Sequence, residues 1–400
     1  MVNIAIMGLG TVGAGVAELL EMNKSLIKKR AGDDIHLKYV LDIRDLSKTP
    51  YANCAVDDFE TILNDPEVDV IIETIGGATI AGAYTLRALR AGKHVITSNK
   101  ELVATRGREL LDIAKEKNVN YLFEASVGGG IPLLRPVSEC LTANLVHEVY
   151  GILNGTTNYI LSRMVRDNAT FGEALKEAQE KGFAELNPSD DVDGKDTCRK
   201  IAILSAMAFR QEMPVDQIPT EGIANICPKD VKIAEAAGYK VKLLGRTIRD
   251  DEGKICAYVA PHLVDATHPL ASIENETNAV IVRDDLLGEV AFVGPGAGKM
   301  PTACSVVADL ITVIHHLNYR KRLNWEAWDG AEAGKPEEVP LRYYYRAKDT
   351  SEAVAKCFPG CRILHEEGGQ VSFITPKMKE FDAEDWAGRL HICSRLCVLN

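Results

Sequence analysis

Short apolar runs alternate with amphipathic stretches along the first third of the chain. Near-continuous apolar runs are typical of buried parallel strands, and they occur at residues 2–7, 36–41, 68–74, 94–97 and 120–124. Apolar positions at helical spacing predict helices at residues 59–63, 80–91 and 102–117. This repeated β-α-β order with short connections predicts an α/β fold with a doubly wound parallel sheet of the Rossmann type.

A glycine-rich turn joins the first apolar run to the first helical pattern. Gly8, Gly10 and Gly13 stand in the spacing G-x-G-x-x-G, with Thr11 and Val12 between the last two. In this context the first glycine permits a tight turn, the second lets the backbone approach a pyrophosphate, and the third lets helix and strand pack closely. The N-terminus of the helix then attracts the phosphates. We therefore predict a nicotinamide dinucleotide site.

The end of the second predicted strand carries charges of both signs. Asp42 would favour a free ribose 2′-hydroxyl, whereas Arg44 and Lys48 would favour a 2′-phosphate. An ordinary charged turn would contain the same residues. The pattern favours NADP slightly and leaves NAD open.

A second concentration of polar residues lies between residues 154 and 200. A strand-like run at 145–153 leads into residues 154–160, where a Thr or an Asn can cap the next helix. An acidic segment then precedes a helix predicted at 195–209, in which Asp196 and Lys200 share one face. A solvated loop with a weak surface ion pair is one interpretation. The same helix is apolar, however, so the pair can point inward, where burial lowers a lysine pKa. The acids lack the spacing of an EF-hand calcium loop.

The last part of the chain has a pattern of its own. After a linker at 321–340, the order β-α-β-β-α-β is typical of a ferredoxin-like module, with strands at 341–347, 361–365, 370–375 and 392–399 and helices at 351–358 and 383–390. Four late cysteines and two histidines offer a zinc site if they meet. Buried reduced thiols are the favoured interpretation, because Cys393 and Cys397 on one strand would lie about 13 Å apart.

Composition narrows the class of protein. The chain has 400 residues, 46% hydrophobic and 26% charged, which is typical of a globular protein of two or three domains. Its formal net charge of −11 argues against non-specific binding to nucleic acid or to anionic membrane. No apolar run reaches the roughly 18 residues of a membrane span, and no signal-peptide pattern begins the chain. We expect a cytoplasmic protein with reduced cysteines.

Five motifs together resemble homoserine dehydrogenase in order and rough spacing: residues 8–13, 98–101, 124–132, 154–160 and 196–200. The resemblance covers about residues 1–320 and implies reversible NAD(P)H-dependent reduction of L-aspartate 4-semialdehyde to L-homoserine, on the route to threonine and methionine. It implies a homodimer or higher homo-oligomer with three parts: a dinucleotide-binding domain at 1–130 with 295–320 returning, a substrate-binding and dimerisation domain at 131–294, and a divergent ACT-like module at 341–400.

The same resemblance implies roles for individual residues. Lys200 matches the proton-transferring lysine, and Lys100 matches a second lysine near the nicotinamide and the substrate oxygen. Positions that match the substrate pocket are Glu185, Asp196, Gly155, Thr156, Phe183 (often Tyr in the family) and Asp191. Positions that match the cofactor site are Gly8, Gly10, Thr11, Val12, Gly13, Arg44, Lys48, Thr74, Ser98, Lys100 and Gly298. A monovalent-cation site, usually sodium, is matched by Glu124 and by the backbone oxygens of Val127, Gly129 and Ile131.

Other functions share some of these features. Aspartate-semialdehyde dehydrogenase has the same substrate but needs a nucleophilic cysteine, and the candidates Cys140 and Cys198 have no suitably arranged histidine in sequence. An inactive dinucleotide sensor would not need Lys100 and Lys200. In the C-terminal module, residues 348–351 replace the Pro-Gly turn usual in ACT domains. We therefore expect this module to serve oligomerisation rather than amino-acid feedback.

Overall fold

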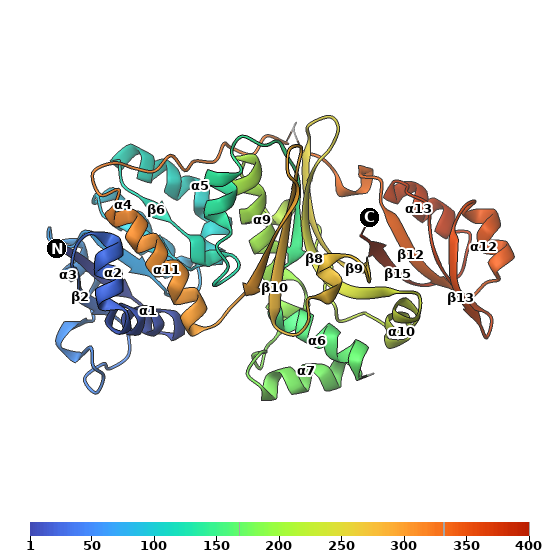
Figure 1. Cartoon of the computed structure of the whole chain (residues 1–400), viewed down its shortest axis with the longest axis horizontal. Helices are drawn as coiled ribbons and strands as arrows, with labels where there is room; N and C mark the ends of the chain where they lie inside the picture. The colour runs from blue at the N-terminus through green and yellow to red at the C-terminus, as the bar shows by residue number, and fades with distance from the viewer. Residues whose placement is uncertain (168, 331–332, 400) are drawn as a thin grey trace. The chain divides into compact units, whose positions relative to one another are not determined.

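The computed structural model describes residues 1–167, 169–330 and 333–399 (Figure 1). These residues form two compact units. The first consists of Met1–Ala143, Ala202–Val215 and Gly294–Trp328. The second consists of Asn144–Ile201, Asp216–Val293 and the described residues from Asp329 onward.

The first unit contains a six-stranded sheet in the order β3-β2-β1-β4-β5-β6, and all its strand pairs are parallel. The strands are β1 (Val2–Met7), β2 (Ile35–Leu41), β3 (Ala55–Val56), β4 (Val70–Glu73), β5 (His94–Thr97) and β6 (Tyr121–Leu122). The doubly wound parallel sheet expected from the sequence is therefore confirmed. The strand order changes direction between β1 and β4, and ligands of such sheets bind at that switch point.

Helices pack on this sheet and complete the hydrophobic core. They are α1 (Thr11–Met22), α2 (Lys24–Ala31), α3 (Phe59–Leu63), α4 (Thr79–Arg90), α5 (Lys100–Lys117) and α11 (Lys299–Ile314). The late helix α11 also belongs to the first unit, which includes Gly294–Trp328. A Cβ atom at Gly15 of α1 would lie 2.8 Å from the carbonyl oxygen of Lys299, so glycine permits the two helices to approach closely.

The second unit contains a nine-stranded mixed sheet in the order β11-β10-β7-β8-β9-β15-β12-β14-β13. Its strands are β7 (Val146–Ile152), β8 (Tyr239–Arg249), β9 (Ile255–Asp265), β10 (Thr277–Asp284), β11 (Gly288–Pro295), β12 (Arg342–Ala347), β13 (Arg362–Glu367), β14 (Gln370–Ile374) and β15 (Ile392–Val398). Its helices are α6 (Gly155–Arg166), α7 (Phe171–Glu180), α8 (Ser189–Val192), α9 (Lys195–Phe209), α10 (Pro228–Ala236), α12 (Ser351–Cys357) and α13 (Glu380–Ala387). The last residues of α9, from Ala202, belong to the first unit.

The C-terminal segment has the predicted β-α-β-β-α-β order. Its four strands pair antiparallel in the order β15-β12-β14-β13, and Tyr345, Phe358 and Phe373 form its aromatic core, with ring centroids 5.3–5.9 Å apart. β15 also pairs in parallel with β9, where Cys397 lies opposite His262. Because of this pairing, the segment shares one continuous sheet with the rest of the second unit.

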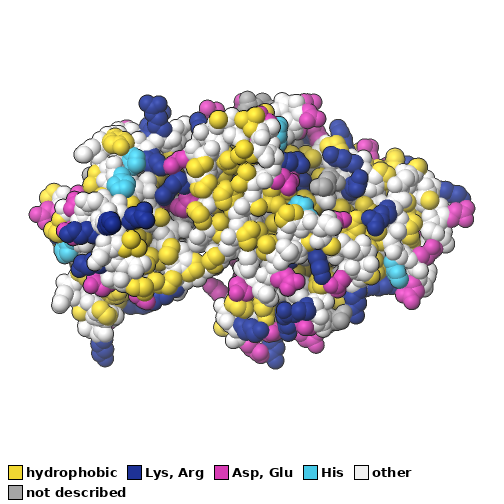
Figure 2. Space-filling model, in the orientation of Figure 1, with side chains coloured by type: hydrophobic (Ala, Val, Ile, Leu, Met, Phe, Trp, Pro, Cys, Tyr) yellow, Lys and Arg dark blue, Asp and Glu magenta, His cyan; other side chains and the backbone are white. Residues whose placement is uncertain are grey.

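Figure 2 shows acidic and basic side chains interspersed over one face of the molecule. Within the described residues, no helix is long and apolar enough to cross a membrane. In the same part of the chain, no group of three or more His, Cys, Asp or Glu side chains is placed to hold a metal ion. The four late cysteines are free thiols: Cys397 is buried, Cys357 and Cys361 are half-buried and Cys393 is exposed, so the expectation that these thiols are buried is wrong for three of them.

Candidate active site

The acidic and basic residues of α9 form a buried ion pair. The side chains of Asp196 and Lys200 are 3% and 9% exposed, and Lys200 Nζ lies 2.8 Å from Asp196 Oδ2. The same ammonium group donates a hydrogen bond to the carbonyl oxygen of Leu153 at 2.7 Å. The inward orientation that the sequence left open is therefore the one observed. Since burying two charges is costly even when they are paired, this pair is a candidate for chemical function.

Asn154 links this ion pair to a second acid. Its side-chain Nδ2 donates to Asp191 Oδ1 at 2.7 Å and to Asp196 Oδ2 at 2.9 Å. Its Oδ1 accepts from the backbone N–H of Thr157 at 2.8 Å, which caps α6. The sequence predicts that a Thr or an Asn of this segment caps the helix, and the structure identifies Asn154 as that residue. The link between the two carboxylates was not predicted. The signal available was that a capping asparagine still has two N–H donors to satisfy.

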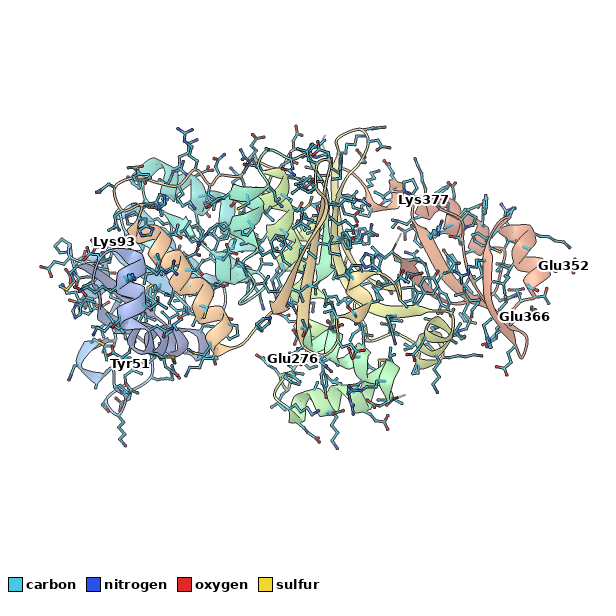
Figure 3. All side chains as sticks on the ribbon, viewed as in Figure 1. Tyr51, Lys93, Glu276, Glu352, Glu366 and Lys377 are labelled. Carbon is cyan, nitrogen blue, oxygen red and sulfur yellow. The ribbon has the colours of Figure 1, made fainter. Side chains whose placement is uncertain are left out.

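The start of α6 lies against two loops of the same unit. A Cβ atom at Gly155 would lie 2.7 Å from the carbonyl oxygen of Glu276, so the loop before β10 approaches the helix as only glycine permits; Glu276 is labelled beside α6 in Figure 3. Thr156 Oγ1 donates to the carbonyl oxygen of Phe183 at 2.6 Å. The Phe183 ring packs 5.0 Å from the ring of Tyr159. The predicted pocket residues Gly155, Thr156 and Phe183 are thus brought together.

Glu185 differs from the other predicted substrate-binding acids because it is exposed. Its backbone carbonyl accepts from Gln179 Nε2 at 3.0 Å. Among the described residues, no hydrogen bond or ion pair joins its carboxylate to Asp196 or Lys200. The structure therefore places Asp191, Asp196 and Lys200 in one bonded cluster and leaves Glu185 outside it.

In the first unit, the glycine turn has the expected geometry. Gly8 has a φ of +93°, which favours glycine, and a Cβ atom at Gly13 would lie 2.0 Å from the carbonyl oxygen of Gly8. Thr74 Oγ1 donates to that same carbonyl at 2.6 Å and so ties the end of β4 to the turn. Thr11 and Val12 are the first residues of α1. This arrangement presents a helix N-terminus at the switch point of the sheet, as dinucleotide binding requires.

The charged residues after β2 meet at the same turn. The carboxylate of Asp42 accepts from the backbone N–H of Leu9 at 2.7 Å and binds the Arg44 guanidinium through two hydrogen bonds of 2.9 and 2.7 Å. Arg44, the largest cause, lowers the pKa of Asp42 well below its usual value. The Arg44 side chain is 59% exposed, and Lys48 is exposed as well. Arg44 is thus exposed beside the glycine turn, and Lys48 is exposed in the segment that follows β2.

Glu73, for which the sequence predicts no role, is fully buried at the end of β4. Its Oε1 accepts from the backbone N–H of Ile75 at 2.6 Å, and its Oε2 accepts from Thr97 Oγ1 at 2.5 Å. Burial raises the pKa of this carboxyl to about 7, although hydrogen bonds partly oppose the shift. The available signal was an acid at the last position of an otherwise apolar strand.

Asn99 extends this network to Lys100. The Thr97 hydroxyl accepts from the backbone N–H of Asn99 at 2.9 Å. Asn99 donates from Nδ2 to the carbonyl oxygens of Ile75 at 3.1 Å and Gly77 at 2.7 Å, and it caps α5 by accepting from the N–H of Leu102 at 3.1 Å. Lys100 is the first residue of that helix. Hydrogen bonds therefore connect the ends of β4 and β5 directly before Lys100, the first residue of α5.

Two further predicted cofactor positions lie at turns of the first unit. Ser98 is half-buried, and its backbone N–H donates to the carbonyl oxygen of Glu73 at 3.4 Å. Gly298 precedes α11 with a φ of +115°, a conformation that favours glycine.

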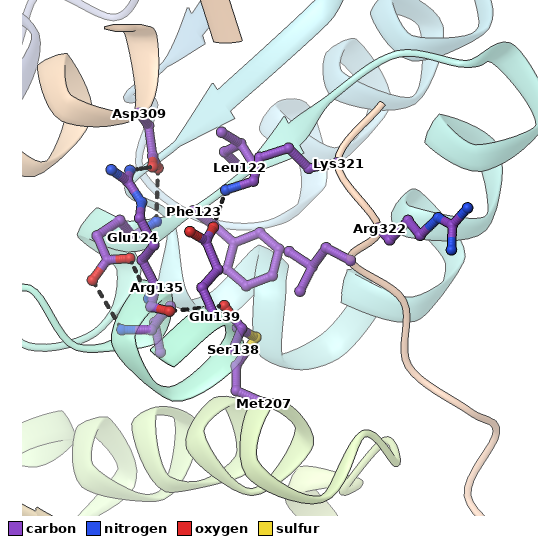
Figure 4. Close-up of a pocket in the computed structure, with 12 residues that line it drawn as sticks. Leu122, Phe123, Glu124, Arg135, Ser138, Glu139, Met207, Asp309, Lys321 and Arg322 are labelled. Carbon is purple, nitrogen blue, oxygen red and sulfur yellow. Dashed lines mark hydrogen bonds and ion pairs between the residues drawn. The ribbon is translucent and has the colours of Figure 1, made fainter. Parts of the chain in front are cut away.

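Glu124 holds the loop that the sequence predicts as a cation site (Figure 4). Its Oε1 accepts from the N–H groups of Leu133 and Leu134 at 2.6 and 2.9 Å, and its Oε2 accepts from that of Arg135 at 2.8 Å. The carbonyl oxygen of Gly129 accepts from Ser305 Oγ at 2.6 Å. Val127 and Ile131 are buried in the same loop. Glu124 Oε1 already accepts two hydrogen bonds, whereas Glu124 Oε2 and the Gly129 carbonyl oxygen each accept one and have a second lone pair. Oxygen is the donor type that hard cations prefer.

Asp309 of α11 completes the polar cluster in Figure 4. Its carboxylate accepts from the N–H of Glu124 at 2.8 Å and from the Arg135 guanidinium at 2.7 Å. Burial, followed by the charge of Glu124, raises the pKa of Asp309 to about 7. The cluster lines a cavity of about 160 Å³ that also contains Glu139 and Lys321.

Comparison with known proteins decides which chemistry this arrangement serves. A family model described as homoserine dehydrogenase matches residues 132–311, and one described as homoserine dehydrogenase, NAD binding domain, matches residues 8–124. The chain is 41% identical to the homoserine dehydrogenase of Bacillus subtilis over 86% of this chain and 79% of the relative. It is 42% identical to that of Pseudomonas aeruginosa over 95% and 89%, respectively.

The chain belongs to the homoserine dehydrogenase family. Solved structures agree: the homoserine dehydrogenase of Thiobacillus denitrificans superposes with a TM-score of 0.89 at 33% identity, covering 100% of this chain and 98% of that one. A hyperthermophilic archaeal homoserine dehydrogenase in complex with NADPH has a TM-score of 0.68 at 25% identity, covering 78% and 97%.

As a homoserine dehydrogenase, the chain is an NAD(P)-dependent oxidoreductase that acts on a CH–OH group and interconverts L-homoserine and L-aspartate 4-semialdehyde. This activity is consistent with a role in threonine and methionine biosynthesis. The family assignment therefore replaces the two alternative functions, aspartate-semialdehyde dehydrogenase and an inactive dinucleotide sensor. Burial also raises the pKa of the Cys198 thiol, which is the opposite of what a nucleophilic cysteine needs.

Proposed function

We propose that Lys200 is the residue that exchanges a proton with the substrate oxygen. The buried contact of its ammonium with Asp196, 2.8 Å away, is the observation that carries this assignment. When bound, the nicotinamide cofactor supplies or accepts the hydride. Negative charge on the substrate oxygen is then stabilised by a nearby ammonium, which can also donate the proton. Lys100 is the second lysine in this proposal, supported by its match to the family motif and by its place at the start of α5.

The neighbouring acids are proposed to hold the substrate. A carboxylate is the natural partner of the ammonium group that homoserine carries, and Asp191 and Asp196 are held together by Asn154. Glu185 is proposed to contact the substrate together with these two acids. It lies on an exposed segment close to Phe183, whose carbonyl oxygen accepts a hydrogen bond from Thr156. Gly155 is proposed to shape the substrate pocket, because the absence of a side chain lets the loop before β10 approach the start of α6.

The preferred cofactor is proposed to be NADP. Arg44 and Lys48 provide two exposed positive charges in the segment after β2, and Arg44 is tied to the glycine turn through Asp42. Positive charge at this strand end suits a 2′-phosphate. A relative of known structure is in complex with NADPH. The cofactor would lie against Gly8, Gly10 and Gly13, with its phosphates at the N-terminus of α1.

A sodium ion is proposed to bind Glu124 and the backbone oxygens of Val127, Gly129 and Ile131. Support comes from the all-oxygen donor set and from the positive φ angles of Gly128 and Gly129, which turn this loop tightly. The ion would be structural.

The chain is further proposed to act as a homodimer or higher homo-oligomer with three functional parts. Residues 1–130 with 295–320 would bind the cofactor, residues 131–294 would bind substrate and dimerise, and residues 341–400 would form a divergent ACT-like module. The ferredoxin-like strand order of that last segment supports the module. We propose that it serves assembly of the oligomer.

Replacement of Lys200 tests the central assignment. In Lys200→Ala, homoserine-dependent reduction of NADP⁺ is expected to fall by at least about 100-fold, because general acid–base catalysis contributes that much. Cofactor binding, measured by fluorescence titration, should remain. A near-normal rate in this variant would remove Lys200 from the mechanism. Omitting phosphate from the assay excludes the acylating reaction of aspartate-semialdehyde dehydrogenase.

A further inference from the structure

Asn154 is the connecting residue between two carboxylates of the candidate site. It is 5% exposed and precedes α6 in an extended conformation. The carboxylates belong to different helices, Asp191 to α8 and Asp196 to α9. Each accepts a hydrogen bond from the same amide nitrogen, at 2.7 and 2.9 Å.

The hydrogen bonds of the Asn154 side chain determine its orientation. A side-chain amide has two N–H donors on nitrogen and an oxygen acceptor. The backbone N–H of Thr157 can only donate, so the Asn154 oxygen must face it, at 2.8 Å. The nitrogen must therefore face the two acids. Both of its N–H groups are used, one on each carboxylate.

The position of the Asn154 amide affects the ionisation of the two carboxylates near Lys200. Two carboxylates at one site disfavour each other's ionised form, whereas N–H donors favour it. Asp196 Oδ2 receives the Asn154 amide and the Lys200 ammonium together. The adjacent backbone contributes as well, because the carbonyl oxygen of Leu153 accepts from Lys200 Nζ at 2.7 Å. Residues 153 and 154 thus position both members of the ion pair.

Asn158 of the same helix shows that this arrangement is not a general property of buried asparagines. Its Nδ2 donates to backbone carbonyl oxygens of Ile273, Asn275 and Thr277 at 2.9–3.3 Å. Its Oδ1 accepts from Lys242 Nζ at 3.0 Å. Asn158 therefore anchors a loop, while the amide nitrogen of Asn154 is directed to ionisable side chains.

We infer that Asn154 is a positioning residue for the dehydrogenase reaction: its amide nitrogen holds Asp191 and Asp196 at fixed places and thereby orients the Lys200 ammonium. The inference rests on the proposed role of Lys200. It adds that the asparagine acts through the acids and the lysine, in addition to capping the helix.

Asn154→Asp separates the two roles. Aspartate caps helices as well as asparagine does, so α6 should keep its cap, whereas a third carboxylate beside Asp191 and Asp196 should lower the thermal melting temperature. The variant replaces two N–H donors with an oxygen of a third carboxylate group, which should raise the pKa of Lys200 and misplace the acids. We expect kcat for homoserine oxidation to fall by about 10–100-fold, the KM for homoserine to rise, and the rising limb of the pH–rate profile to move to higher pH. Thr170→Ala, which removes the exposed cap of α7, is the matched control and should leave the profile unchanged.

A wild-type kcat and pH–rate profile in Asn154→Asp would overturn the inference. It would also be overturned if the variant lost stability as Asn154→Ala does and its folded fraction kept the wild-type profile, because Asn154 would then be a helix cap alone. Lys200→Ala distinguishes this failure from failure of the proposed mechanism. A normal Asn154→Asp with an inactive Lys200→Ala removes only the role of Asn154, whereas an active Lys200→Ala removes the mechanism itself.

Discussion

Each unit contains a buried carboxylate near a candidate site, Glu73 in the first and Asp196 in the second, and the two differ in the partners that stabilise them. Glu73 at the end of β4 accepts from the neutral donors Ile75 and Thr97, and burial raises its pKa to about 7. Asp196 on α9 has the Lys200 ammonium 2.8 Å away. A buried acid with a cationic partner keeps its charge, whereas one with neutral partners holds its proton more tightly. The comparison separates a charged cluster suited to proton transfer from a near-neutral carboxyl suited to shaping a loop.

Removing the charged carboxylate should give the largest effect. In Asp196→Ala, Lys200 loses its ion-pair partner and the proposed substrate site loses an acid, so kcat/KM for homoserine should fall by at least about 100-fold. Steady-state kinetics with homoserine as the varied substrate measure this change. Glu180→Ala is a suitable control, because Glu180 forms an exposed i,i+4 pair with Lys176. If kcat and KM stay unchanged in Asp196→Ala, the buried pair has no part in catalysis.

Glu73 should affect stability rather than the chemical step. Its folded pKa of about 7 exceeds the usual 4.5, so its contribution to stability is fully present below pH 4.5 and is lost as the pH rises through 7. The shift corresponds to roughly 3 kcal/mol. Glu73→Gln cannot ionise, and its free energy of unfolding should fall less than that of the wild type between pH 5 and pH 8. Urea denaturation at the two pH values measures the difference, and equal losses in both proteins would contradict the assignment.

The cofactor residues should give a smaller and more selective effect. Arg44→Ala removes a cation that would contact a 2′-phosphate, so the KM for NADPH should rise about tenfold while that for NADH changes little. The variant also removes the two hydrogen bonds that the Arg44 guanidinium donates to the Asp42 carboxylate. Initial rates with each cofactor measure the ratio. An equal change for both cofactors would show that Arg44 only supports the turn.

The smallest effect concerns the proposed cation. Replacing sodium chloride with tetramethylammonium chloride at equal ionic strength should lower the melting temperature by about 2 °C, because a bound ion stabilises only the folded state. The difference should disappear in Glu124→Gln. A melting temperature that is the same in both salts would argue against a sodium site.

The sequence by itself determined most local elements. Residues 2–7, 59–63, 94–97 and 195–209 have the predicted bounds, because period-specific apolar patterns and caps act over a few neighbouring residues. The predicted strand at 120–124 is shorter, covering Tyr121–Leu122, since Glu124 leaves the strand to accept three backbone amides. The two-residue β3 and the charged α2 were missed, because their sequences carry little periodic apolar signal.

Only the tertiary structure decided which of these residues meet. The spacing of Asp196 and Lys200 allowed a surface pair or a buried one, and the choice depends on Leu153 and Asn154, more than forty residues earlier in the chain. The burial of Glu73 depends likewise on Thr97 of the adjacent strand, and the union of β9 with β15 depends on segments more than a hundred residues apart. A local sequence pattern indicates which face of a helix or strand a residue lies on. The pKa and the partners of that residue depend on chain segments that folding brings beside it.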